Sequence, residues 1–303
     1  MKLPFKIKPS KQAFRASFFI NIIALIFYFI VIGGFSINDL GYFILTFFTA
    51  SIVLENFLTS YKTRLEEINI LKDQENYRRE FLGNVSHELK TPLFTIQGYI
   101  LTLIEGALKD KKVRGKYLRR SAKGVDRLIS IVKDLDLITQ FESGIKTVDK
   151  TDFNIYELIE NVYDLMEFES EKNNTKLLVY NENNTPVIVN ADKERILQVL
   201  TNLVVNSIKY GKEGGYTKVK VEEYDKDRII VRVKDNGEGI EDEHLPRLFE
   251  RFYRIDKNRS RKKGGSGLGL SIVKHIIEAH QEQIFVESKI GQGTEFSFTL
   301  QKP

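Results

Sequence analysis

Residues 81–93 read FLGNVSHELKTPL, a predicted helix in which a polar patch lies opposite an apolar face. His87 stands in that patch, and an imidazole ring is a competent nucleophile at neutral pH. Glu88 can accept the proton of one ring nitrogen, which leaves the lone pair of the other nitrogen available for attack. Thr91 follows one helical turn after His87 and could hold a water molecule beside a group attached there. We therefore predict His87, Glu88 and Thr91 as catalytic residues.

A zinc site and nucleic-acid binding are both disfavoured by the residues present. The zinc-protease pattern needs a second histidine four residues after the first, and this chain has Thr91 there. No cysteine is present, which excludes disulfides and thiolate zinc sites. The 303 residues include 46 basic and 41 acidic side chains, and a net charge of +5 over that length does not mark a nucleic-acid-binding protein.

Helical sequence extends on both sides of this stretch. Glycine and proline are absent from Glu55 to Leu82, and apolar residues between Leu58 and Ile68 follow at spacings of 3, 4 and 3, which predicts a helical linker over 59–80. Downstream, an apolar stripe predicts a second helix over Tyr117–Phe141, connected to the first by the polar stretch Lys109–Lys116. One hairpin buries its stripe poorly, whereas two make a four-helix bundle, so 81–142 is predicted to be a dimeric domain.

The N-terminal part of the chain is apolar. Ala16–Asn38 carries no charge, and its 23 residues would span about 34 Å as a helix, enough for a hydrocarbon core of about 30 Å. A second uncharged run from Leu40 to Leu54 leads us to expect two transmembrane helices within 16–58, with a short connection near Ser36–Gly41. Basic residues place segment 1–15 in the cytoplasm, and the second span returns the chain there. A signal peptide and a buried hairpin are the alternatives; a long apolar run without a cleavage site disfavours the first.

The hydrophobic period changes after about Thr147. Helices and strands alternate from there, with more strands than helices, and most of the strands follow one another. Residues 147–303 are therefore predicted to form an α+β sandwich with a mixed sheet. The expected helices are Ile155–Glu171, Asp192–Tyr210 and Gly267–His280, and the expected strands are Lys176–Tyr180, Val187–Asn190, Tyr216–Tyr224, Arg228–Lys234, Gln283–Ser288 and Glu295–Leu300.

A polar face on the helix near 192–210 is the first sign of a ligand site. Asn202, Asn206 and Lys209 recur at i, i+4 and i+7, opposite an apolar face. Asparagine is a poor helix former, so two of them within a helix need a reason. Amide oxygens are hard ligands suited to Mg²⁺, and a lysine suits phosphate. A merely solvated helix face is the alternative.

Two glycine-containing segments strengthen this interpretation. Asp235 ends a predicted strand and opens DNGEGI, so its carboxylate could accept a hydrogen bond from an exocyclic amine while Gly237 and Gly239 let backbone approach a flat ring. LFERFYR (248–254), the basic run 257–263 and GGSGLGL (264–270) follow, and glycines opening a helix beside cations form a polyphosphate site. The spacings of the Rossmann and P-loop motifs are not met.

Six motifs in order, SHELKTPL, NLVVNSIKY, DNGEGI, LFERFYR, GGSGLGLSIVKHI and GQGTEFSF, resemble those of a membrane sensor histidine kinase of a two-component system. The resemblance covers about Glu75 to Leu300. It implies a dimerising phosphoacceptor hairpin, followed by an ATP-binding domain that shares its fold with gyrase, Hsp90-type chaperones and mismatch-repair ATPases. The chain departs from the family pattern at Ser207, where alanine is usual, and no HAMP-like module fits between Ser60 and Phe81.

The resemblance also implies roles for single residues. His87 would take the γ-phosphoryl group of ATP with Glu88 as its base, and Thr91 would position water to dephosphorylate the response regulator. Asn206 would hold Mg²⁺ with help from Asn202. Lys209 and Arg254 would contact phosphates, Tyr210 would flank the adenine, and Asp235 would accept a hydrogen bond from its amine. Gly265, Gly267 and Gly269 would form the hinge of the lid. The whole expected nucleotide site is Asn202, Asn206, Lys209, Tyr210, Asp235, Gly237, Gly239, Arg254, Gly265, Ser266, Gly267, Leu268, Gly269 and Thr294.

The implied partners are a second copy of the chain, a response regulator, membrane lipid and another membrane protein as signal input, with no nucleic acid. The implied location is the bacterial inner membrane, crossed more than once, with the catalytic domains in the cytoplasm. A gyrase-type ATPase and an inactive scaffold are the alternatives. SHELKTPL upstream disfavours the first, and the presence of His87, Asn206 and Asp235 disfavours the second.

Overall fold

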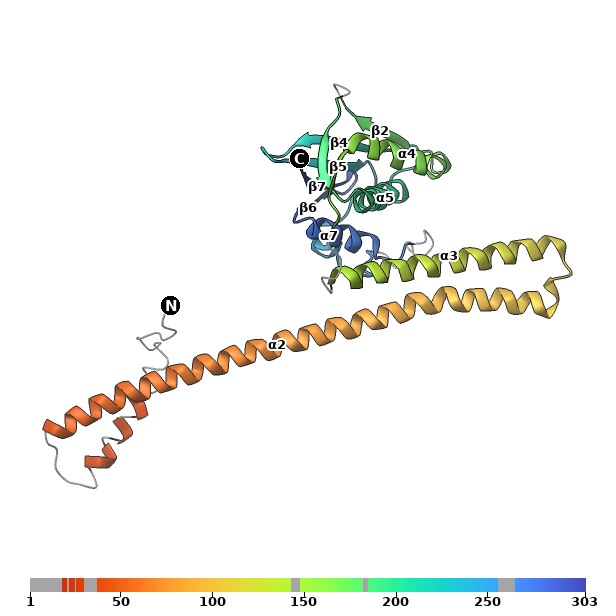
Figure 1. Ribbon diagram of the computed structural model, residues 1–303. Coiled ribbons are helices and arrows are strands. Elements are labelled where there is room, and N and C mark those ends of the chain that lie inside the picture. Colours follow the sequence, from red (N-terminus) through yellow and green to blue (C-terminus); the bar gives the residue numbers. More distant parts are fainter. Residues whose placement is uncertain are drawn as a thin grey trace. The chain divides into compact units, whose positions relative to one another are not determined.

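The computed structural model describes residues 18–20, 22–24, 26–29, 37–142, 148–181, 185–255 and 265–303 (Figure 1). The chain divides into two compact units, Met1–Leu82 and Gly83–Pro303. The expected cytoplasmic segment 1–15 and the basic run 257–263 with Gly264 lie outside the described residues.

A single long helix, α2 (Ile37–Thr102), contains the second apolar run, the expected linker and the SHELKTPL motif. Within the described residues, one helical stretch is long and apolar enough to cross a membrane, Ile44–Ala107, and 6% of its most apolar window is buried. The connection expected near Ser36–Gly41 is wrong for Ile37–Gly41, which are helical; the stretch contains no proline, and a single glycine is tolerated within a helix. The first expected span is described only in part, so two spans remain a prediction.

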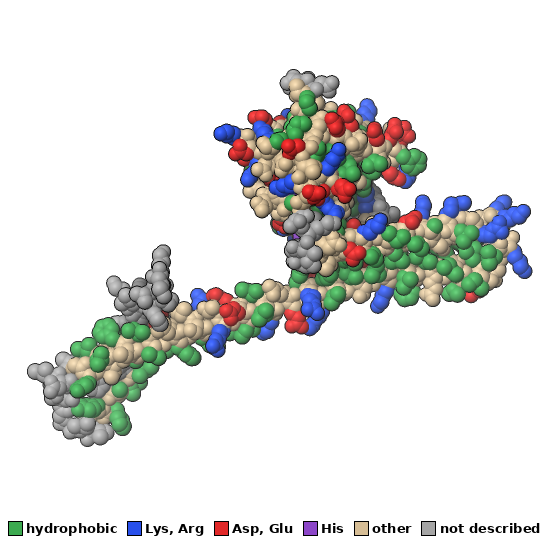
Figure 2. All heavy atoms as spheres, viewed as in Figure 1, with side chains coloured by type: hydrophobic (Ala, Val, Ile, Leu, Met, Phe, Trp, Pro, Cys, Tyr) green, Lys and Arg blue, Asp and Glu red, His purple; other side chains and the backbone are tan. Residues whose placement is uncertain are grey.

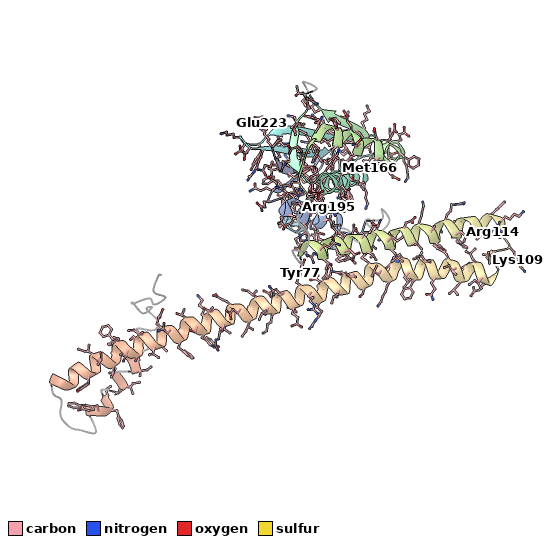
Figure 3. All side chains as sticks on the ribbon, viewed as in Figure 1. Tyr77, Lys109, Arg114, Met166, Arg195 and Glu223 are labelled. Atoms are coloured by element: carbon pink, nitrogen blue, oxygen red, sulfur yellow. The ribbon has the colours of Figure 1, made fainter. Side chains whose placement is uncertain are left out.

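The hairpin expected over 81–142 is present in the second unit. The last part of α2 runs into a short π-helix, η1 (Leu103–Ala107), where Gly106 has a φ of 137°, and α3 (Lys111–Glu142) returns. The expected connection Lys109–Lys116 was too long, because the Asp110 carboxylate accepts hydrogen bonds from the amides of Lys112 (2.9 Å) and Val113 (3.4 Å) and starts α3 early. Figure 3 labels Lys109 and Arg114 at this turn.

Close packing holds the hairpin together beside the SHELKTPL motif. A Cβ atom on Gly124 of α3 would lie 2.6 Å from the side chain of Ile96 on α2, so only glycine allows this approach without a shift. Nearer the turn, the rings of Tyr99 and Tyr117 stack with centroids 5.2 Å apart. Much of the hairpin's apolar surface nevertheless stays exposed in one chain, including Phe94 (63%) and Ile104 (67%) (Figure 2).

The rest of the second unit is the expected α+β sandwich. Five strands form a mixed sheet in the order β2-β4-β5-β7-β6, in which only β2 and β4 are parallel, and β1 pairs with β3 in a separate antiparallel ribbon. The strands are β1 (Thr151–Asn154), β2 (Lys176–Tyr180), β3 (Ile188–Ala191), β4 (Tyr216–Glu223), β5 (Arg228–Asp235), β6 (Ile284–Lys289) and β7 (Gly293–Gln301). The helices are α4 (Ile155–Lys172), α5 (Lys193–Tyr210) and α7 (Gly269–Ala279), with a short 3-10 helix η2 (Asp242–Arg247).

The helices and the sheet share one core. Alternating side chains of β5 and β7 pack with the apolar faces of α4, α5 and α7, and Leu137 and Ile138 of α3 join the same cluster. The β1 strand was not expected because it has only four residues, of which Phe153 alone is buried. η2 was also missed, since Pro246 lies inside it and its polar sequence resembles a loop.

A buried histidine fixes the start of α5 against the end of α7. The Nε2 atom of His280 accepts a hydrogen bond from the amide of Asp192 (3.0 Å), and Nδ1 lies 2.7 Å from the carbonyl of Ile276. Both ring nitrogens are therefore used by backbone groups, and burial lowers the pKa of this imidazole. His280 is a structural residue that orients α5, the helix whose polar face was expected to bind a nucleotide.

Candidate functional site

A cavity of about 460 Å³ brings together nearly all of the expected nucleotide-binding residues. It lies among α5, the end of β5, the segment before α7 and one face of α3, and every residue expected in the nucleotide site lines it except Gly237 and Leu268. Leu268 is instead fully buried in the core just before α7. Gly237 has a supporting position, because its amide donates to Asp235.

Asp235 lies at the end of β5 with its carboxylate buried. Its Oδ1 atom accepts hydrogen bonds from the amides of Gly237 (2.8 Å) and Thr294 (3.2 Å). Both bonds use the same oxygen, so the position of the carboxylate is fixed while Oδ2 has no part in either. Burial raises the pKa of this carboxyl group, and the two amide hydrogen bonds oppose that rise. Asp235 thus presents an acceptor to the cavity.

Two glycines let backbone segments cross beside the cavity. Gly239 has a φ of 76°, and a Cβ atom there would collide with the backbone carbonyl of Lys289. Gly267 has a φ of 77°, and its Cβ would lie 2.8 Å from Cα of Phe252. The glycine pattern of the sequence therefore marks positions where only glycine fits.

The apolar part of the cavity lining was not expected from sequence. Ile240, Leu248 and Phe296 line the cavity, and they come from the segment after β5, the residue that follows η2, and β7. A flat, apolar ring with an amine at its edge fits a cavity that has both a carboxylate and such a lining. Each residue looks like an ordinary core residue in sequence, so periodicity could not separate it from the rest of the core.

The polar face of α5 also lines the cavity. Asn202 and Asn206 contribute amide groups there, and Lys209 follows one turn later. Two amide oxygens are too few to hold a free Mg²⁺ ion, which prefers six oxygen ligands, but they fit an ion that brings phosphate and water oxygens with it. The residues thus fit Mg²⁺ bound with a nucleotide, and Asn206 and Asn202 would be the side chains that hold it.

Lys209 has an unusual charge environment. Burial, together with the nearby positive charges of Arg254 and Arg127, lowers the pKa of its ammonium group to about 8. Three cations that lie close together repel one another, and the single carboxylate of Glu88, which pairs with Arg127 and Arg254, leaves the group with a net positive charge. The site is therefore electrostatically prepared for a polyanion.

This environment makes a testable prediction about pH. The protonated ammonium group would bind phosphate, so ATP affinity should be highest below pH 8 and fall by about tenfold for each pH unit above it, with proton uptake on binding. Titration calorimetry in buffers of different ionisation enthalpy measures both quantities. Lys209→Arg should flatten the profile because a guanidinium stays charged. An equally steep profile in that variant would assign the dependence to another group.

The hairpin also contributes to the cavity, through Ser130 and Asp134 on α3. Burial raises the pKa of the Asp134 carboxyl group to about 6. Neither residue was expected from sequence, because they lie outside the recognised motifs. Their i, i+4 spacing on α3 is the one signal, and it is common on solvated helix faces.

The expected catalytic residues lie on α2. His87 and Thr91 are both exposed, and the Thr91 hydroxyl donates a hydrogen bond to the backbone carbonyl of His87 (3.2 Å). Glu88 differs, because its carboxylate pairs with Arg127 of α3 and Arg254, each at 3.2 Å. Arg254 was expected to meet phosphates and does line the cavity, but it also joins the nucleotide site to the neighbour of His87.

Comparisons with known proteins agree with this arrangement. Residues 77–144 match the His Kinase A (phospho-acceptor) domain, and residues 191–303 match the histidine kinase-, DNA gyrase B- and HSP90-like ATPase family. The sensor histidine kinase WalK of Bacillus subtilis is 37% identical over 75% of this chain, and the sensor protein kinase WalK of Staphylococcus aureus is 35% identical over 80%. The chain spans 37% and 58% of the length of these two relatives.

Solved structures show the same combination. The histidine kinase AdeS of Acinetobacter baumannii has a TM-score of 0.57 and 27% identity, covering 71% of this chain and 98% of that one. The histidine kinase ThkA, solved in complex with the response regulator protein TrrA, has a TM-score of 0.59 and 28% identity, covering 79% and 66%. With both domains in the order of that family, and with WalK among its relatives, the chain belongs to the sensor histidine kinases of two-component systems.

Proposed function

We propose that this protein transfers the γ-phosphoryl group of ATP to His87 and then to an aspartate of a response regulator. The observation that carries the proposal is the contact between Glu88, next to His87, and Arg254, which lines the nucleotide cavity. A nucleotide in that cavity would have its phosphates near the helix that carries the histidine. The two matched domains support the same reaction.

The proposed transfer needs only groups that the chain and the nucleotide supply. One imidazole nitrogen of His87 forms a bond to phosphorus, the bond from the γ-phosphorus to its bridging oxygen breaks, and ADP leaves. The proton on the other ring nitrogen passes to Glu88. Lys209 and Arg254 stabilise the phosphate oxygens, and Mg²⁺ held by Asn206 and Asn202 would supply further positive charge.

Nucleotide selection follows from the other end of the cavity. Asp235 would accept a hydrogen bond from the adenine amine, Tyr210 would flank the ring, and the apolar part of the lining would cover it. The segment from Gly265 to Gly269, with Ser266 within it, would close over the phosphates, and Thr294 would hold Asp235 in place through its amide.

We also propose a phosphatase activity toward the regulator. The hydroxyl hydrogen of Thr91 is donated to the carbonyl of His87, so the hydroxyl oxygen remains an acceptor for a water hydrogen. A water held there could attack a phosphoaspartate brought to the same face. The exposed threonine beside the exposed histidine supports this second role.

The exposed apolar hairpin supports a homodimer through a four-helix bundle, as proposed for 81–142. The other proposed partners are a response regulator, membrane lipid and a second membrane protein as input. We propose two spans within 16–58 at the bacterial inner membrane, a linker over 59–80 and an ATP-binding domain over 147–303 in the cytoplasm. The apolar stretch beginning at Ile44 supports the membrane location.

The test is transfer of label by the full-length protein in nanodiscs. With ATP labelled on the γ-phosphate and Mg²⁺, the protein should acquire an acid-labile, base-stable phosphoryl group, which an added receiver domain then removes. Release of inorganic phosphate without any labelled protein would support the gyrase-type ATPase instead.

A further inference from the structure

The carboxylate of Glu88 lies between two guanidinium groups from different parts of the chain. Nη2 of Arg127 and Nη2 of Arg254 are each 3.2 Å from Oε2. The side chains of Glu88 and Arg254 are 12% and 7% exposed, so their pair is largely shielded from water, while Arg127 is 30% exposed. Both pairs use Oε2, and Oε1 has no part in either.

The two arginines differ in what else they can reach. Arg127 lies on α3, within the same hairpin as Glu88, and does not line the nucleotide cavity. Arg254 lines the cavity, and its Nη2 also donates to the carbonyl of Gly265 in the glycine segment. Of the two arginines, Arg254 is the one that lines the cavity, so it can pair either with the carboxylate or with a phosphate bound there.

When a nucleotide enters the cavity, its charge determines whether Arg254 pairs with Glu88 or with the phosphates. A triphosphate carries several negative charges, whereas Glu88 has one that Arg127 already compensates. Lys209 and Arg254 also repel each other, and phosphate oxygens would relieve that repulsion. The phosphate should therefore draw Arg254 away from Glu88, and the base would be left with Arg127 alone.

We propose that Arg127 is a positioning residue for Glu88, and that Arg254 exchanges between Glu88 and the nucleotide phosphates. The proposal rests on the phosphotransfer function proposed above and assigns how its base is controlled. Without nucleotide, Arg254 and Arg127 together hold Glu88. With nucleotide, Arg254 leaves, and Arg127 keeps the carboxylate beside His87 with Oε1 facing the proton that must be removed.

The exchange has an unusual consequence for binding. A nucleotide must compete with Glu88 for Arg254, so the apparent affinity equals the intrinsic affinity multiplied by the fraction of Arg254 that is not paired with Glu88. Glu88→Gln keeps the shape of the side chain and removes the competing charge. The Glu88→Gln protein should bind ATP about three- to tenfold more tightly than the parent protein, although Glu88 does not line the cavity.

Arg127→Gln should act in the opposite direction. Arg254 then becomes the sole cation paired with Glu88 and is held there more firmly, so ATP affinity should not rise. The phosphorylation rate at saturating ATP should fall by about tenfold or more, because the base loses its fixed position. Arg127→Lys should restore part of that rate, since it returns a cation to the same place. Arg119→Gln, an exposed arginine earlier on α3, is the matched control and should change neither quantity.

The experiment uses full-length protein in nanodiscs, with calorimetric titration of ATP and initial labelling rates at several ATP concentrations. Melting temperatures establish that each variant is folded. An unchanged or weaker ATP affinity in Glu88→Gln would overturn the exchange of Arg254. An unchanged saturating rate in Arg127→Gln would overturn the positioning role. If the parent were not labelled on His87 at all, the proposed function would fail, while the tighter binding of Glu88→Gln would still report the exchange.

Discussion

In the His87→Gln variant we expect no incorporation of the γ-phosphoryl group of ATP, with nucleotide binding unchanged. Glutamine offers an amide nitrogen whose lone pair is delocalised, so the nucleophile is removed while size and polarity are kept. The side chain of His87 is exposed on α2 and does not line the cavity, so the substitution should alter neither the core nor the nucleotide site. Labelling should drop to background, about a thousandfold or more.

The measurement is the acid-labile, base-stable label on full-length protein, read together with ATP affinity on the same sample. His275→Gln is the matched control, because His275 lies on α7 outside the SHELKTPL motif and its ring contacts Arg251. That variant should keep its label. Persistent labelling of His87→Gln would move the phosphoacceptor to another residue, and loss of ATP binding would show that His87 supports the cavity.

Much of the ATP-binding domain could be predicted because its signals are local. The bounds of β2 agree with the expectation, and α5 ends at Tyr210 as expected. Helical spacing also brought Asn202, Asn206 and Lys209 to one face, since residues at i, i+4 and i+7 share a side of any helix. The glycines at 239 and 267 could also be predicted, because two backbone segments that pass this closely require glycine, and a glycine is visible in the sequence itself.

The electrostatics of the site could not be predicted, because they depend on residues far apart in the chain. Arg254 and Glu88 are separated by 166 positions, and each taken alone was assigned a different partner. Asp134 lies in the hairpin, yet it lines a cavity built by another domain. Short elements were missed for a different reason, since β1 and η2 are too short to show a period.

The Asp235→Asn substitution should weaken ATP binding by about ten- to a hundredfold, which corresponds to about 1.5–3 kcal/mol for a lost hydrogen bond to a buried charged group. The reason lies in the two amides that donate to Oδ1 of Asp235. If the asparagine oxygen stays with those amides, its NH₂ group takes the place of Oδ2 and meets the adenine amine, donor against donor. If the side chain flips, the amides of Gly237 and Thr294 lose their acceptor. Neither orientation satisfies all of the donors.

The position of the Asp235 carboxylate also allows a change in base recognition to be distinguished from a general loss of nucleotide binding. Guanine presents a carbonyl oxygen where adenine has its amine, so the carboxylate of the parent should repel GTP, and the amide of Asp235→Asn should accept it. We therefore expect the preference for ATP over GTP to narrow as ATP affinity falls, measured by displacement of a fluorescent nucleotide. Asp134→Asn is the matched control in the same cavity, and because it removes a negative charge, ATP affinity should hold or rise. Equal binding of ATP and GTP by the parent protein would contradict the role of Asp235, since a fixed carboxylate acceptor cannot be indifferent to that exchange of donor for acceptor.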